Sequence, residues 1–141
     1  MLPSIELPSR TLSFRTDLNI LVVRWHPVVE TLAAVQADYA QMLASAKAHG
    51  LSAWLLDVRR RQVAALELGP WVNTTFYPEA VARLAPQRLR VAVLSSPALT
   101  AAYTTNPGHQ KEVAYALDPA RPFDMALFED EGRAMQWLGR A

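Results

Sequence analysis

The sequence predicts a single α/β domain in which a mixed, mainly parallel sheet opens with a β-hairpin and carries about four helices. The first observation is that short apolar runs of strand length alternate with longer segments of helical periodicity. The second is composition, because 51% of the 141 residues are hydrophobic and only 19% are charged, which suffices for the core of one ordinary domain. The expected order is β-β-α-β-α-β-α-β-α, with right-handed crossovers between the parallel strands.

The hairpin is expected after a mobile lead over residues 1–10, so that the domain itself spans residues 11–141. Residues 11–16 alternate between apolar and polar side chains, which favours an edge strand with one buried face. Residues 17–19, Asp-Leu-Asn, predict a tight turn into the apolar, β-branched run 20–25.

The clearest single element is an amphipathic helix that starts after Pro27, a residue suited to the first helical turn. Its apolar side chains recur at helical spacing, at Val28, Leu32, Val35, Tyr39, Met42, Leu43 and Ala46. Gly50 then provides a natural C-terminal stop after about five to six turns.

Two nearly continuous apolar runs, residues 52–58 and 89–94, are typical of parallel strands that are covered on both faces. Between them, residues 71–84 predict a helix that Pro78 must kink or divide. This alternation of strand and helix is the basis for expecting a parallel sheet.

The last third of the chain follows the same order with shorter elements. Residues 97–103 predict a short helix, residues 104–108 a loop, and residues 123–128 the last strand. Residues 113–117 fit a strand and a helix equally well. Asp130 is placed to cap a final helix.

Composition and motifs exclude several function classes. The formal net charge of +1 gives no bias toward nucleic acid, and the chain has no cysteine for disulfide, thiolate or iron–sulfur chemistry. No signal peptide is evident, and no apolar run approaches the ~20 residues of a membrane-spanning helix. His26, His49 and His109 lack the spacing of metal ligands, and no phosphate-binding glycine motif is present. We therefore expect a cytoplasmic protein that carries no cofactor.

Candidate site residues gather where strands end, because ligands of open parallel sheets bind beyond the carboxyl ends of the strands. Asp57 ends one apolar run, and Arg59 and Arg60 follow it within an arginine triplet. These residues either contact a ligand or partner, or form a structural pair in which an arginine turns back to Asp57. Ser95 and Ser96 follow the next apolar run and lie at the same expected edge.

A second candidate site is aromatic. Trp71, Phe76 and Tyr77 recur near helical spacing and either pack in the core or gate an apolar pocket. In the second case, an arginine would hold the anionic head of a small molecule or lipid. Trp137 on the final helix is expected either to cover the sheet or to anchor a homodimer.

The element order resembles the STAS-like fold, which is named for sulfate transporters and anti-sigma-factor antagonists. The resemblance covers Leu12 to about Leu138 and rests on the opening hairpin, the strands SAWLLD and LRVAVLSSP, and the terminal helix FEDEGRAMQWL. Small bacterial STAS-like proteins of unassigned role have a similar tail, in which an acidic turn precedes an Ala-x-x-Trp-Leu helix.

The resemblance implies that the end of the third strand corresponds to the place where phosphorylatable antagonists carry the motif Asp-x-Ser-Gly. This chain has Asp57-Val58-Arg59-Arg60 there, so the aspartate matches while arginines replace the serine and the glycine. Arginine has no hydroxyl to receive a phosphate, and its fixed charge is opposite in sign to that of phosphoserine. Switching by a kinase is therefore not expected in this chain.

The resemblance and the lack of catalytic motifs predict a non-enzymatic regulatory or protein-interaction domain, which binds an unidentified protein partner beside Asp57. The alternative is a small-molecule or lipid-binding domain with an apolar pocket. No Gly-x-Ser-x-Gly motif accompanies the serines and histidines, so no residue is predicted to be catalytic.

Overall fold

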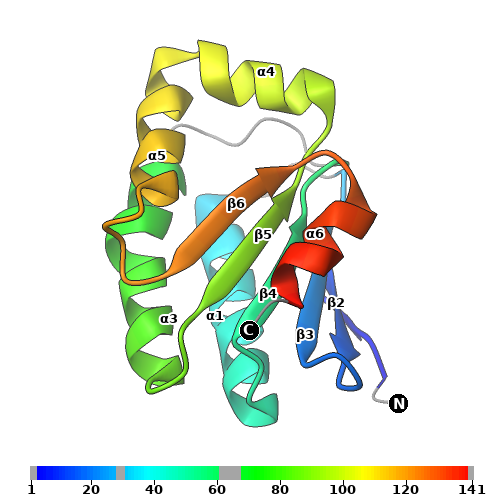
Figure 1. The fold of residues 1–141 in the computed structure, drawn as a ribbon. Helices are drawn as coiled ribbons and strands as arrows, with labels where there is room; N and C mark the ends of the chain where they lie inside the picture. Colours follow the sequence, from blue (N-terminus) through cyan, green and yellow to red (C-terminus); the bar gives the residue numbers. More distant parts are fainter. Residues whose placement is uncertain (1–2, 28–30, 61–67, 140–141) are drawn as a thin grey trace.

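A computed structural model describes residues 3–27, 31–60 and 68–139. The strands are β1 (Ile5–Glu6), β2 (Arg10–Arg15), β3 (Ile20–Trp25), β4 (Ala53–Asp57), β5 (Arg90–Leu94) and β6 (Asp124–Phe128). They form one sheet in sequence order, in which the first two strand pairs are antiparallel and the other three are parallel (Figure 1). The predicted fold class, an α/β domain with a mixed and mainly parallel sheet, is confirmed.

The sheet begins earlier than predicted. β1 pairs with β2, with Ile5 opposite Leu12, and Arg10 at the start of β2 is completely buried. The segment 3–10, expected in a lead outside the domain, therefore belongs to the edge of the sheet. β2 and β3 form the predicted hairpin, and Asn19 lies in its turn with a φ of 58°, a left-handed conformation that Asn tolerates.

α1 (Leu32–His49) is the predicted long helix. Its first turn is capped by Thr31, whose hydroxyl accepts a hydrogen bond from the Ala34 N–H at 3.1 Å. The earlier start expected at residues 28–30 falls outside the described residues. Gly50 ends the helix as predicted, with a φ of 64° at which a residue with a Cβ would be strained.

The predicted helix over residues 71–84 is interrupted. α2 (Leu68–Trp71) runs into a π-helical segment, η1 (Val72–Phe76), and then into α3 (Tyr77–Leu84). Pro78, which has no N–H to donate, lies in the first turn of α3, where proline is tolerated. The expectation that Pro78 kinks or divides the helix is confirmed, and the division takes the form of a π-helical turn.

α4 (Pro97–Thr105) and α5 (Pro107–Leu117) follow one another with only Asn106 between them, and they meet at a corner (Figure 1). The loop expected over residues 104–108 is wrong, because Asn106 alone separates the helices and caps α5 by accepting a backbone hydrogen bond at 3.0 Å. The ambiguous segment 113–117 is the C-terminal part of α5.

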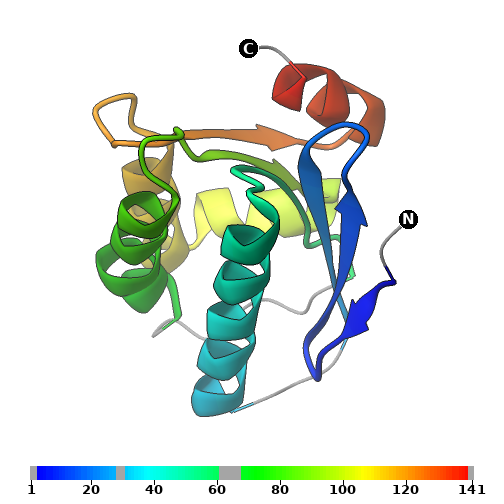
Figure 2. The same cartoon turned by 90° about the horizontal axis from the view of Figure 1, so that it is seen from below.

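Helices cover both faces of the sheet. α1, η1, α3, α4 and α5 lie on one side, and α6 (Glu131–Leu138) lies on the other (Figures 1 and 2). The apolar core is divided accordingly, because side chains alternate along each strand. Trp54 and Leu56 of β4 pack in the larger helical layer, whereas Leu55 packs in a smaller cluster with Leu138 of α6.

The last helix begins as predicted after Asp130, whose carboxylate accepts a hydrogen bond from the Arg133 N–H at 2.9 Å. Trp137 packs beside Phe128 with ring centroids 5.8 Å apart, and the Arg90 guanidinium lies 4.3 Å from the Trp137 ring. Arg90 also donates to the Trp137 carbonyl at 2.8 Å, at a helix end where carbonyls lack intrahelical partners. Trp137 therefore covers the sheet, and its role in a homodimer stays a prediction.

Asp130→Ala should lower the free energy of unfolding by about 1 kcal/mol, because the first turn of α6 then loses its side-chain cap. Urea unfolding followed by circular dichroism measures the change. Glu129→Ala is the control, since Glu129 is exposed and should leave the stability within about 0.5 kcal/mol of the original. Equal losses in the two variants would contradict the capping role.

Candidate functional site

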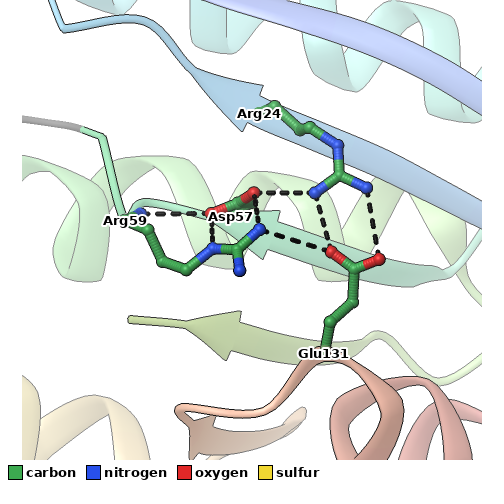
Figure 3. Close-up of polar contacts among 4 residues, drawn as sticks. All are labelled: Arg24, Asp57, Arg59 and Glu131. Carbon is green, nitrogen blue, oxygen red and sulfur yellow. Dashed lines mark hydrogen bonds and ion pairs between the residues drawn. The ribbon is translucent and has the colours of Figure 1, made fainter. Parts of the chain in front are cut away.

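Two candidate sites lie at the carboxyl ends of the parallel strands, on opposite faces of the sheet. The first, on the α6 face, is the ion-pair cluster formed by Arg24, Asp57, Arg59 and Glu131 (Figure 3). The second is a cavity between the strand ends and the larger helical layer.

Strand pairing brings the side chains of the ion-pair cluster together. Arg24 of β3 and Asp57 of β4 are register partners, and Arg24 Nη1 lies 2.7 Å from Asp57 Oδ2. Arg59 turns back over Asp57, with its Nε 2.9 Å from Oδ1 and its Nη2 2.9 Å from Oδ2. Glu131, the first residue of α6, lies 2.8 Å from Arg24 and 3.5 Å from Arg59. Two cations thus meet two anions in one compact group (Figure 3).

Asp57 is the buried member of the cluster, with only 6% of its side chain exposed. Burial alone would raise the pKa of its carboxyl, but hydrogen bonds from Arg59 and Arg24 outweigh burial and hold the pKa below its usual value. The pKa of Glu131 is also lowered, chiefly by the hydrogen bond from Arg24. The other three side chains are 41% to 44% exposed, so solvent screens their outer edges.

The geometry fits the structural interpretation of Asp57, in which an arginine turns back to it. Asp57 Oδ1 also accepts the Arg59 backbone N–H at 3.1 Å, so both carboxylate oxygens are already hydrogen-bonded. The cluster ties β3 and β4 to the start of α6. Arg60 is exposed beside it, and Arg61 lies outside the described residues.

Ser95 and Ser96 also have structural partners. The Ser95 N–H donates to the Phe128 carbonyl at 2.8 Å, and its hydroxyl donates to the Ser96 carbonyl at 3.3 Å. The Ser96 hydroxyl caps α4 by accepting the Leu99 N–H at 3.1 Å. Neither serine belongs to the ion-pair cluster or to the described residues that line the cavity.

The three aromatic residues that were predicted to pack in the core or to gate a pocket differ in their positions. Phe76 is buried and packs with ring centroids 4.7 Å from Tyr39 and 6.0 Å from Trp71. Tyr77 packs against Phe76 at 5.4 Å and also lines the cavity. Trp71 and Phe76 are not among the described lining residues, so of the expected aromatic gate only Tyr77 reaches the cavity.

The cavity has a volume of about 150 Å³ and lies at the carboxyl ends of β3 to β6. Strand residues form one wall, and residues of all the helical segments on this face of the sheet, from α1 to α5, contribute the others. The lining is mainly aliphatic and aromatic, as shown by Val72, Tyr77, Val93, Val113 and Leu127. This is the place at which open α/β sheets bind ligands.

Polar groups interrupt the lining at Asn73, His109 and Glu112. Asn73 Nδ2 donates to the Glu112 carbonyl at 3.0 Å and to Glu112 Oε2 at 2.8 Å. His109 is buried, and its ring packs edge-on against Tyr103 with centroids 5.1 Å apart. No sequence motif marks these residues, and α5, which carries two of them, was expected partly as a loop.

A buried polar network lies behind one wall of the cavity. Arg10 Cζ lies 4.2 Å from the Trp25 ring and 4.0 Å from the Tyr39 ring, and both rings belong to residues that line the cavity. Arg10 Nε donates to the Ser9 hydroxyl at 3.1 Å, and that hydroxyl donates to Asp38 at 2.6 Å. The network supports the aromatic wall through cation–π contacts.

In comparisons with known proteins, the chain matches no family model, no curated protein and no solved structure. The resemblance to the STAS-like fold therefore stays a prediction. Over the described ranges, no group of three or more His, Cys, Asp or Glu side chains is arranged to hold a metal ion. The described helices include none with the length and apolar character needed to cross a membrane.

Asp57→Asn should lower the free energy of unfolding at pH 7 by about 1–3 kcal/mol, because Arg24 and Arg59 then lose the charged partner that they share. Asp17→Asn is the control, since Asp17 pairs with Arg15 on the surface with 63% of its side chain exposed. Such a pair contributes little, so the control should be indistinguishable from the original in urea unfolding. A control variant that loses as much stability would contradict the role of burial.

The lowered pKa values of Asp57 and Glu131 predict a loss of stability in acid. The unfolded chain binds more protons than the folded chain, so the stabilisation is present above the unfolded pKa and is lost as the pH falls through the folded pKa. The decline should begin below about pH 5. Asp57→Asn, which lacks one of the two carboxyls, should decline less steeply in urea unfolding measured across pH. An unchanged slope would contradict the contribution of Asp57.

Proposed function

We propose that this chain is a non-enzymatic binding domain that takes a small, mainly apolar molecule into the cavity. The observation that carries the proposal is an apolar space of about 150 Å³ at the carboxyl ends of four adjacent strands. Ligands of open α/β sheets bind at this edge, where the connecting segments diverge. Small-molecule binding is one of the two alternatives that the sequence left open.

The size of the cavity fits a ligand of about one ring or a short chain. An engineered cavity of about 150 Å³ with aliphatic and aromatic walls binds benzene in another protein. Val72, Val93 and Val113 supply comparable walls here. Transfer of apolar surface from water into such walls contributes about 25 cal/mol per Å². The proposal is therefore made for small molecules of this size.

The carboxyls with shifted pKa values show no sign of a general acid. The carboxyls of Asp17, Asp57, Asp124 and Glu131 all have pKa values lowered by arginine partners. A general acid that works at neutral pH requires a shift in the opposite direction. None of these four residues is among the described residues that line the cavity.

A regulatory, protein-interaction role is the second candidate, and the exposed edge of the ion-pair cluster favours it. Arg24, Arg59 and Glu131 expose 41% to 44% of their side chains, so a charged partner has access to them while Asp57 stays buried. A cytoplasmic STAS-like regulator would combine the two roles, with a partner on one face and a ligand on the other. In that case Arg60→Glu should weaken partner binding and leave ligand binding unchanged.

Toluene is a suitable first probe, because it is neutral, apolar and ring-sized. Its addition to ¹⁵N-labelled protein should shift the amide resonances of Val72, Tyr77 and Val113 in a saturable manner. Ala116 lines the cavity, so Ala116→Leu should fill it and weaken binding by about tenfold or more. Ala114 is exposed on the same helix, and Ala114→Leu should bind like the original. The cavity would be ruled out as a binding site by equal affinities in all three proteins, or by the lack of any saturable shift.

A further inference from the structure

We propose that the ligand of the cavity is a neutral, ring-sized molecule with one hydrogen-bond donor, as in a phenol, and that Asn73 accepts this hydrogen bond. The inference rests on the proposed function, since it specifies the ligand class of the same cavity. It departs from the sequence-based expectation of an anionic head held by an arginine.

The side-chain amide of Asn73 has a defined orientation. Its Nδ2 donates to two acceptors of Glu112, the backbone carbonyl at 3.0 Å and Oε2 at 2.8 Å. An amide oxygen cannot pair with either acceptor, so Oδ1 must occupy the other branch of the amide. No described residue donates to Oδ1, although Asn73 is only 6% exposed. Oδ1 is not among the fully buried atoms that lack a partner, so it is an unused acceptor at the cavity wall, which water or a donor on a ligand can reach.

Local backbone features place Asn73 at the cavity wall. It lies in the π-helical segment η1, in which the Tyr77 N–H bonds to the Val72 carbonyl five residues back. Such turns change the direction of side chains relative to a regular helix and recur at functional sites. Gly69 allows α5 to approach closely, because a Cβ there would lie 3.0 Å from Glu112 Cγ. Together these features bring Glu112 and Asn73 into contact.

The charges around the cavity argue against an anionic ligand. Among the described lining residues, Glu112 carries a carboxylate and none is a lysine or an arginine. An anion would therefore leave water for apolar walls beside a carboxylate, and no described lining residue would give it a cationic partner. That transfer is strongly unfavourable.

Arg10 argues against a cationic ligand. Its guanidinium lies 4.2 Å and 4.0 Å from the rings of Trp25 and Tyr39, two residues that line the cavity. These rings already stabilise one cation, and a second cation nearby would be repelled. A neutral ring with one donor fits both the apolar walls and the acceptor on Asn73.

Four single-ring probes test the ligand class: toluene, phenol, benzoate and benzylammonium. Each is titrated into the unmodified chain, with the cavity amide resonances as the readout. Toluene and phenol differ by a methyl group in place of a hydroxyl, so the ratio of their affinities reports the net effect of offering the site a hydrogen-bond donor. We expect phenol to bind roughly tenfold more tightly than toluene. We expect each ion to bind at least roughly tenfold more weakly than phenol.

Asn73→Leu tests the acceptor itself. The leucine has a similar volume without the amide oxygen, so phenol would bury its hydroxyl without this acceptor and should bind no more tightly than toluene. Thr75→Val is the matched control, because Thr75 is an exposed residue of η1, and it should keep the preference for phenol. A full preference for phenol in Asn73→Leu would overturn the role of Asn73.

The possible outcomes distinguish a wrong ligand class from a wrong proposed function. Toluene binding as tightly as phenol, or an ion binding most tightly, would overturn the ligand class and leave the proposed function standing. Failure of all four probes to bind would overturn the proposed function as well. If Asn73→Leu does not fold, the phenol-to-toluene ratio in the unmodified chain still decides the inference.

Discussion

The alternation of side chains along β4 determines which groups meet at the carboxyl end of the sheet. β4 lies between β3 and β5, and its residues from Trp54 to Asp57 are buried, so each side chain there needs a partner in one of two layers. Leu56 and Val58 face the larger helical layer and line the cavity. Asp57, between them, faces α6 and its arginine partners. One strand end thus separates an apolar space from a charged cluster.

The ion pairs that balance the negative charge of Asp57 connect the end of β4 to α6. A buried carboxylate requires cationic or hydrogen-bonding partners, which Arg24 and Arg59 supply, while Glu131 balances the two arginines from the start of α6. The Arg59 guanidinium contacts both carboxylate oxygens of Asp57, each at 2.9 Å. The face with the ion-pair cluster is held together by internal contacts, whereas the opposite face keeps space for a ligand.

Features that depend on neighbouring residues were predictable from the sequence, and contacts between distant elements were not. Gly50 and Asp130 mark helix ends because capping involves only a few adjacent positions.

Pairing of Asp57 with Arg59 was predicted as one alternative, because the two lie two positions apart. Glu131 lies 107 positions from Arg24, and no local pattern connects them. The cavity was equally hidden, because Asn73 reaches it through a π-helical turn that no sequence motif marks.

A crystal structure of the chain with phenol tests the division between the two faces most directly. We predict one phenol ring in the cavity, in contact with Val72 and Val113, and its hydroxyl within hydrogen-bond distance of Asn73 Oδ1. The ion-pair cluster on the other face should be unchanged. Phenol bound at Arg24 and Arg59 instead, or a cavity filled by neighbouring side chains, would contradict this division.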